Sequence, residues 1–139
     1  MIEYPMKFKA EAKLNGGWTA TAHGQPSLTC DVPEAFGGAG AGYSPEDLIG
    51  LSVMTCFMGT FKVFAEKSGL SFSDLSGNVE IFLDRNEEKV VSVTEVHLHF
   101  SLTGVTDEEK AHALLTDAQK SCIVANSLKS KNNFTFTIN

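Results

Sequence analysis

The chain has 139 residues, of which 42% are hydrophobic, and a formal net charge of -6 at pH 7. This length predicts a single domain, residues 1–139, with one substantial core. The hydrophobic fraction excludes a disordered polymer, and the acidic balance argues against a nucleic-acid partner. Small and polar residues interrupt the longest apolar run, residues 48–65, so we expect no membrane span. Three cysteines do not form a secretory disulfide framework, and without a visible signal peptide we expect a cytoplasmic location.

The first third of the chain predicts an antiparallel meander of strands. Residues 4–14 alternate roughly between apolar and polar, and Asn15, Gly16 and Gly17 form a strong turn signal before residues 18–22. A second turn at residues 24–26 leads to a third strand that carries Cys30. The glycine-rich segment 37–42 lacks the Lys-Ser/Thr ending of a phosphate loop, so we interpret it as a connector.

Residues 44–68 predict a long helix that ends at Gly69. Ser44 can cap it, Pro45 suits its first turn, and the acidic residues that follow complement its dipole. Apolar residues cover most of its circumference, so we expect it to be buried on nearly all sides. It would be roughly 35 Å long. A single small sheet could hardly cover such a helix, whereas a partner chain could.

The second half alternates between long strands and short helices. Residues 78–84 and 90–102 predict two strands joined by a charged turn at residues 85–89. Thr106 opens a capping box for a helix that runs to about Gln119. A short helix follows from Cys122, with Ser121 as its candidate cap, and residues 134–138 predict a closing strand.

Two cysteines are the first candidates for chemistry. Cys56 lies within the long helix and Cys122 at the start of the short one. The ordinary alternative is that both are small buried hydrophobes. The helix start predicts that Cys122 is the easier thiolate, and the apolar helix predicts that Cys56 is the more sheltered thiol.

Glu46 is a candidate base or orienting carboxylate, although it can equally be a simple partner of the helix dipole. On one continuous helix it lies about 15 Å along the axis from Cys56. It therefore cannot hydrogen-bond that thiol within one chain. Any shared role requires Glu46 of a second subunit.

Other candidate sites are weaker. His97 and His99 share one face of a predicted strand, but no third ligand is near in sequence. A solvated or packed strand face is the favoured interpretation. No Gly-x-Ser-x-Gly elbow indicates a serine hydrolase.

The sequence resembles the OsmC/Ohr family of thiol peroxidases. Residues 33–57, which read PEAFGGAGAGYSPEDLIGLSVMTCF, carry most of the likeness, and Cys122 ahead of Asn126, Ser127 and Leu128 carries the rest. With the order of strands and helices, the likeness covers nearly the whole chain. It implies an α+β fold with antiparallel sheets packed on long central helices. It also implies an intertwined homodimer with active sites at the subunit interface.

The resemblance also implies a reaction. Cys56 matches the family's peroxidatic cysteine, Cys122 the resolving cysteine and Glu46 the active-site carboxylate. An organic hydroperoxide would oxidise Cys56 to a sulfenic acid, which Cys122 would condense to a disulfide. A small thiol or dithiol would then reduce that disulfide, and neither a metal nor a flavin cofactor is required.

One family feature is missing. Members that confer organic hydroperoxide resistance carry an Arg shortly after a Gly-Gly in the N-terminal meander, whereas here Trp18 follows Gly17 and the only arginine is Arg85. We therefore expect Cys56 to be a poor thiolate and peroxide turnover to be slow. The alternative function is a non-peroxidatic dimer that binds a small apolar ligand at the subunit interface. Both cysteines favour the enzyme, and the missing Arg favours the binding protein.

Overall fold

The computed structural model describes residues 2–139, whose contacts group into two compact units, Met1–Leu48 and Ile49–Asn139. In the N-terminal unit, β1 (Ala10–Lys13), β2 (Thr19–Ala22) and β3 (Leu28–Thr29) form a sheet in the order β1-β2-β3. Both strand pairs are antiparallel, so the predicted meander is confirmed. Gly16 and Gly17 adopt φ values of 81° and 100°, which the β1–β2 turn requires and other residues resist.

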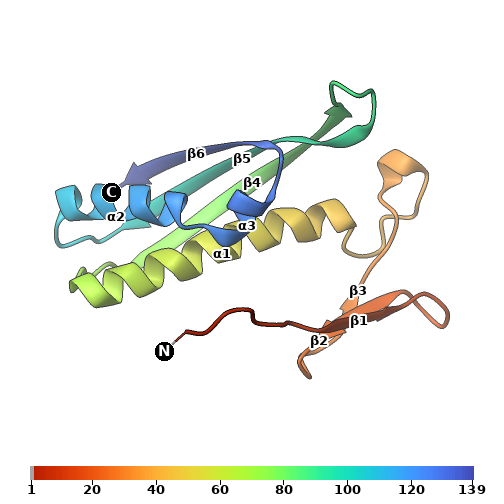
Figure 1. Ribbon diagram of the computed structural model, residues 1–139, viewed down its shortest axis with the longest axis horizontal. Helices are drawn as coiled ribbons and strands as arrows, with labels where there is room; N and C mark the ends of the chain where they lie inside the picture. Colours follow the sequence, from red (N-terminus) through yellow and green to blue (C-terminus); the bar gives the residue numbers. More distant parts are fainter. Residues whose placement is uncertain (1) are drawn as a thin grey trace. The chain divides into compact units, whose positions relative to one another are not determined.

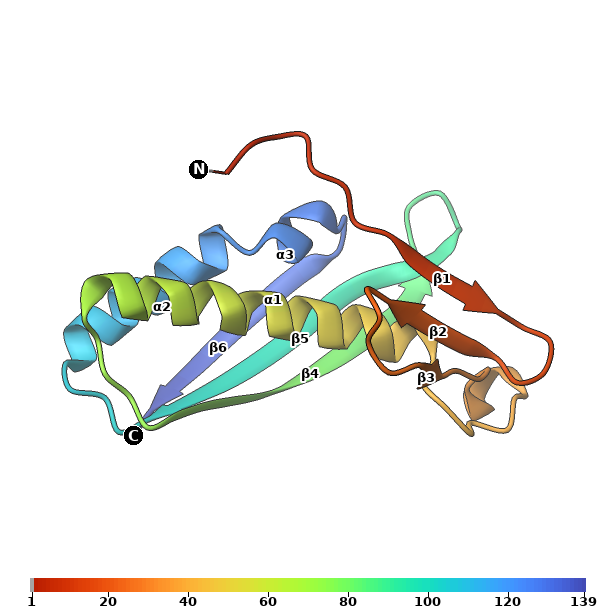
Figure 2. The same cartoon turned by 90° about the horizontal axis from the view of Figure 1, so that it is seen from below.

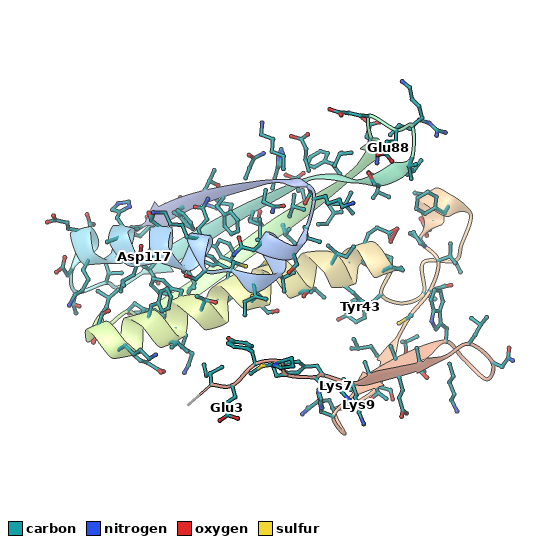
Figure 3. The ribbon with its side chains drawn as sticks, in the orientation of Figure 1. Glu3, Lys7, Lys9, Tyr43, Glu88 and Asp117 are labelled. Atoms are coloured by element: carbon teal, nitrogen blue, oxygen red, sulfur yellow. The ribbon has the colours of Figure 1, made fainter. Side chains whose placement is uncertain are left out.

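The rest of the N-terminal unit leads into the long helix. A 3-10 turn, η1 (Glu34–Phe36), is followed by an extended segment in which Tyr43 forms a bridge with Cys30. Cys30 therefore lies just beyond β3, and its side chain is buried. Lys7 and Lys9 are exposed on the irregular segment that precedes β1 (Figure 3).

In the C-terminal unit, a sheet with the order β4-β5-β6 carries three helices on one face (Figure 1). Its strands are β4 (Asp74–Arg85), β5 (Val91–Thr103) and β6 (Lys131–Ile138). The helices are α1 (Pro45–Ser68), α2 (Glu108–Lys120) and α3 (Ile123–Ser127). Figure 2 shows α2 and α3 beside α1 on the same side of this sheet. The predicted α+β class is confirmed.

The sheet is mixed because of its last strand. β4 and β5 pair antiparallel and form a long hairpin with Glu88 at its tip (Figure 3). β6 pairs parallel to β5, since α2 and α3 return the chain to the end of the sheet where β5 begins. β4 and β6 begin earlier than alternation alone predicted, whereas β5 is displaced by one residue from the predicted range 90–102.

An aromatic cluster forms the centre of the core. Phe57 of α1 stacks on Phe100 of β5 with ring centroids 4.2 Å apart, and it lies 5.5 Å from both Phe134 and Phe136 of β6. Alternate residues of β5 are buried toward the helices, as the two-residue period of a strand requires. The core thus joins one helix face to one sheet face.

The helix α1 bears on two expectations. Only one of its faces is buried within the chain, and that face consists of Gly50, Val53, Phe57, Phe61 and Ala65. Its other side is open, with Val63 43% exposed and free space around Gly59. By length and composition α1 could also span a membrane, contrary to our expectation, but core helices of soluble proteins meet the same criterion. Its buried face packs on the sheet as a core helix does.

Two predicted helix caps are also corrected. The N-cap of α2 is Asp107, whose Oδ1 accepts a hydrogen bond from the Lys110 N–H at 3.0 Å, and not Thr106. Thr106 instead exchanges 3.4 Å hydrogen bonds with the backbone of Ser71. The N-cap of α3 is Cys122, because Ser121 belongs to the end of α2.

Candidate functional site

The start of α1 is fixed by a reciprocal cap. The Asp47 N–H donates to Ser44 Oγ at 3.0 Å, and the Ser44 N–H donates to Asp47 Oδ2 at 2.9 Å. This pairing satisfies two backbone donors that helix formation leaves without partners. It sets the helical register that places Glu46 in the first turn and Cys56 near the middle of α1.

Cys56 lies at the edge of the buried face of α1. Its side chain is partly buried and packs against the core, while the next residue, Phe57, is completely buried. The Cys56 thiol is free rather than bonded to another cysteine. Its position gives it both an apolar surrounding and access from outside the core.

Cys122 occupies the short link between α2 and α3. Its side chain is completely buried, and its thiol donates to the backbone carbonyl of Val53 on α1 with an Sγ–O distance of 3.8 Å. Cys122 is in the N-cap position of α3, although its sulfur makes no well-formed capping hydrogen bond. This link therefore attaches α3 to the middle of α1.

The thiols of Cys56 and Cys122 lie close enough to interact, because Cys56 is among the groups that raise the pKa of Cys122. Helix geometry explains their proximity, since the Cα–Cβ bonds of a helix tilt toward its N-terminus. The Cys56 side chain therefore leans over the turn that contains Val53, where Cys122 docks.

The pKa of the Cys122 thiol is raised to about 11. Burial is the main cause, and the nearby Cys56 thiol adds to it. The N–H groups of Ala125 and Val124 act in the opposite direction but do not compensate. The expectation that Cys122 is the easier thiolate is therefore wrong, because burial outweighs the short helix.

Glu46 has a carboxylate oxygen, Oε2, that is buried without a hydrogen-bond partner in the described chain. The helix α1 is continuous from Pro45 to Ser68, so ten residues of helix separate Glu46 from Cys56, about 15 Å along the axis. Within one chain this carboxylate therefore does not reach the thiol. A buried oxygen of this kind is costly unless it acquires a partner.

No positively charged group is among the causes that change the pKa of the Cys122 thiol. Arg85 donates from Nη1 to the Lys89 carbonyl at 2.9 Å and so closes the β4–β5 turn. Lys62 forms an ion pair with Glu66 on the exposed side of α1. Arg85 and Lys62 thus have other partners in the described structure.

The histidines of β5 are part of a polar sheet surface. His99 bonds to Thr135 through Nδ1 at 2.8 Å and to Thr137 through Nε2 at 3.1 Å. His97 Nε2 lies 3.5 Å from the Glu95 carboxylate. No three His, Cys, Asp or Glu side chains within residues 2–139 are placed to hold a metal ion. This agrees with the interpretation of a packed strand face.

Sequence reasoning missed two features of this region. The Val53 carbonyl is a main-chain group, so no side-chain pattern identifies it as the partner of Cys122. Gly59 lies in open space on α1, with no atom within 4 Å of an added Cβ. A glycine inside a helix makes the helix less stable, so the presence of Gly59 within the predicted helix was the signal that the sequence offered.

The candidate site thus consists of one buried and one half-buried thiol on an α+β fold. Comparison with known proteins identifies the family. The model of the family described as OsmC-like protein matches residues 37–137. This chain belongs to the OsmC-like protein family. No curated protein sequence matches it significantly.

Solved structures share the fold along the whole chain. An OsmC-like protein of unknown function from Vibrio cholerae is 17% identical, with a TM-score of 0.83 and coverage of 97% of this chain and 100% of its own. An organic hydroperoxide resistance protein from Elizabethkingia anophelis is 20% identical, with a TM-score of 0.82 and coverage of 99% and 100%. An organic hydroperoxide resistance protein OsmC from Legionella pneumophila is 23% identical, with a TM-score of 0.77 and coverage of 99% of both chains.

Proposed function

We propose that this protein is a cysteine-based thiol peroxidase that reduces organic hydroperoxides to alcohols. The observation that carries the proposal is the docking of Cys122 on Val53 of α1, one turn before Cys56, which brings the two thiols within interaction range. Cys56 is the more accessible thiol, which suits attack on a substrate, and Cys122 is enclosed beside it, which suits disulfide formation. Membership of the OsmC-like family and neighbours named organic hydroperoxide resistance proteins support these roles.

In the first step, the Cys56 thiolate attacks the terminal oxygen of the hydroperoxide. The S–O bond forms as the O–O bond breaks, and the departing alkoxide takes a proton to become the alcohol. Cys56 is then a sulfenic acid. In the second step, the Cys122 sulfur attacks the Cys56 sulfur, the S–O bond breaks, and water leaves with the Cys122 proton. A small thiol or dithiol reduces the resulting disulfide, so no metal or flavin takes part.

The substrate class follows from the surroundings of Cys56. Its partly buried side chain packs against apolar neighbours of the core, which includes Val53 one turn earlier on α1. Such neighbours favour a peroxide with a hydrocarbon group over hydrogen peroxide, because burying that group releases water from apolar surface. The reduced thiols and the absence of a disulfide framework fit a cytoplasmic location.

The proposal includes an intertwined homodimer in which each chain, residues 1–139, forms one domain. The side of α1 opposite its core face exposes Leu51, Val63 and the space at Gly59, which a second helix could fill. In the N-terminal segment, Ile2, Tyr4, Met6 and Phe8 are also exposed. The buried Oε2 of Glu46 has no hydrogen-bond partner in the described chain. In a dimer, Glu46 of one subunit would approach Cys56 of the other, a thiol that it cannot reach within its own chain.

Stopped-flow mixing of the reduced protein with cumene hydroperoxide and with hydrogen peroxide tests this function. We expect oxidation of Cys56 to be faster with cumene hydroperoxide, to produce one disulfide per chain, and to be lost in Cys56→Ser. Reaction no faster than that of free cysteine with either peroxide would exclude the peroxidase.

A second candidate is a dimer that binds a small apolar ligand without turnover. Beyond Cys56, α1 lines a cavity of about 400 Å³ whose apolar wall includes Met58, Phe72 and Leu75. Trp18 replaces the expected Arg, which also favours this function. Saturable binding of an apolar fluorescent probe by a protein that is inert to both peroxides would identify it.

A further inference from the structure

Cys122 is placed to contact two acceptors on the same face of α1. Its sulfur lies 3.8 Å from the Val53 carbonyl oxygen, and Cys56, three residues later on the same helix, is close enough to raise its pKa. Residues three apart on a helix are neighbours on one face, so both acceptors lie within the rotation of a single S–H bond. The Val53 carbonyl also belongs to the helix ladder, whereas the Cys56 sulfur does not.

We propose that the Cys122 thiol stabilises the Cys56 thiolate by donating its S–H hydrogen bond to it, in the place of the missing cationic partner. Cys122 is then a positioning residue before the peroxide arrives, in addition to the resolving residue of the proposed function on which this inference rests. A hydrogen bond to a charged acceptor is roughly twice as strong as one between neutral groups. The S–H therefore turns from the Val53 carbonyl to the Cys56 sulfur when Cys56 loses its proton.

The state of Cys122 suits a donor. Its thiol is completely buried, and this burial raises its pKa, so it keeps its proton over the range in which an exposed thiol ionises. Two interacting thiols titrate as a pair. Cys122 therefore retains a proton that it can donate to the Cys56 sulfur.

The surroundings of the pair offer few alternatives within the C-terminal unit. α3 has no ionisable side chain, and Lys120, at the end of α2, is exposed. On α1 the nearest cation along the chain, Lys62, is paired with Glu66. The strand residues that share the helix-facing side of the sheet carry no charge, and a polar one among them, Asn132, donates to the Ala125 carbonyl of α3 at 3.0 Å. The ionisable residues Glu80, Glu95, His97 and His99 alternate with them on the other face.

Alkylation of Cys56 without any peroxide tests the inference. The rate of iodoacetamide modification at Cys56 is followed by peptide mass spectrometry in the full-length reduced protein between pH 5 and pH 10. Three proteins are compared: the unmodified chain, Cys122→Ser, which keeps a hydroxyl donor, and Cys122→Ala, which removes it at nearly the same volume. We expect the midpoint of the profile to rise by about one pH unit in Cys122→Ala, a tenfold loss of thiolate at lower pH. In Cys122→Ser we expect it to stay close to that of the unmodified chain.

Equal midpoints in all three proteins would overturn the inference, as would an equal rise in both variants, which would indicate a packing effect. If Cys122→Ala does not fold, the isosteric pair Cys122→Thr and Cys122→Val repeats the comparison in a slightly larger volume. The Thr variant should then keep the lower midpoint, and equal midpoints in this pair would refute a role for the donor. Because no peroxide is used, a protein that fails as a peroxidase can still pass this test, and an active peroxidase can fail it.

Discussion

The Cys122 thiol donates to the backbone carbonyl of Val53 across 3.8 Å, one helical turn before Cys56. This contact joins the link between α2 and α3 to the middle of α1. It brings together two thiols that are separated by 65 residues in the sequence. The position of α3 along α1 therefore decides whether the two cysteines can react with each other.

The first prediction concerns a disulfide. Mild oxidation with diamide should form one Cys56–Cys122 bond within a chain, because Cys122 docks one helical turn before Cys56 and a modest movement would bring the sulfurs to the S–S bond length of about 2.05 Å. Non-reducing mass spectrometry of peptides measures it. Cys56→Ser and Cys122→Ser should each abolish the bond, and Cys30→Ser, in the N-terminal unit, should leave it intact. A bond that includes Cys30 would contradict the proposed pair.

The second prediction concerns pH and stability. The pKa of Cys122 is raised to about 11 in the folded protein, so its protonated thiol favours the folded state below the unfolded pKa of about 9. That contribution is lost as pH rises from about 9 to about 11. Urea unfolding under reducing conditions should show that the stability advantage of the unmodified chain over Cys122→Ala narrows, by on the order of 2 kcal/mol, across this range. A constant difference would mean that burial does not suppress ionisation of Cys122.

The third prediction concerns the aromatic core. Phe57→Ala should destabilise the fold by about 3–5 kcal/mol, because it removes a completely buried ring and leaves a cavity beside Phe100 and Phe134. Phe36→Ala is the matched control, since Phe36 is 59% exposed in η1. Chemical denaturation of both variants measures the difference, and similar losses would place Phe57 outside the core.

The fourth prediction concerns the open side of α1. Gly59→Leu should weaken the proposed homodimer, because a large side chain would fill the space that a second helix is expected to occupy. Ala113→Leu, on the exposed side of α2, makes the same small-to-large change away from α1. Sedimentation velocity at micromolar concentration compares them. A monomeric unmodified protein would refute the dimer, and unaffected association in Gly59→Leu would place the interface elsewhere.

The fifth prediction concerns the start of α1. Ser44→Ala should cost about 1 kcal/mol, because it removes the hydroxyl that accepts the Asp47 N–H at 3.0 Å. Thermal unfolding measures the loss. Ser52→Ala, at an exposed position inside the same helix, should cost little or nothing and serves as the control. Equal effects of the two changes would show that the cap does not stabilise α1.

Elements with strong local signals were predicted well from the sequence. The helix α1 begins after Ser44 and ends before Gly69, where the capping residue and the glycine predicted it. The meander followed from its turn glycines, and the β4–β5 hairpin from its alternation. These features depend on residues that are neighbours in the chain, so local physical chemistry was sufficient.

Predictions that required a choice between two adjacent residues as the N-cap of a helix were less accurate. Asp107 rather than Thr106 caps α2, because the Thr106 hydroxyl bonds to Ser71, 35 residues away. Cys122 rather than Ser121 begins α3, because α2 continues to Lys120. In both cases the choice was made by packing that the local sequence does not contain.

The sequence by itself determined the α+β order of elements, the bounds of α1 and the two cysteines that merit study. Only the tertiary structure decided their environment. Burial of Cys122 beside Val53 made it the protonated thiol of the pair, against the expectation from its helix position. The physical reason is that desolvation depends on every atom packed around a group, and those atoms come from α1, α2 and α3 together rather than from the neighbours of Cys122 in the chain.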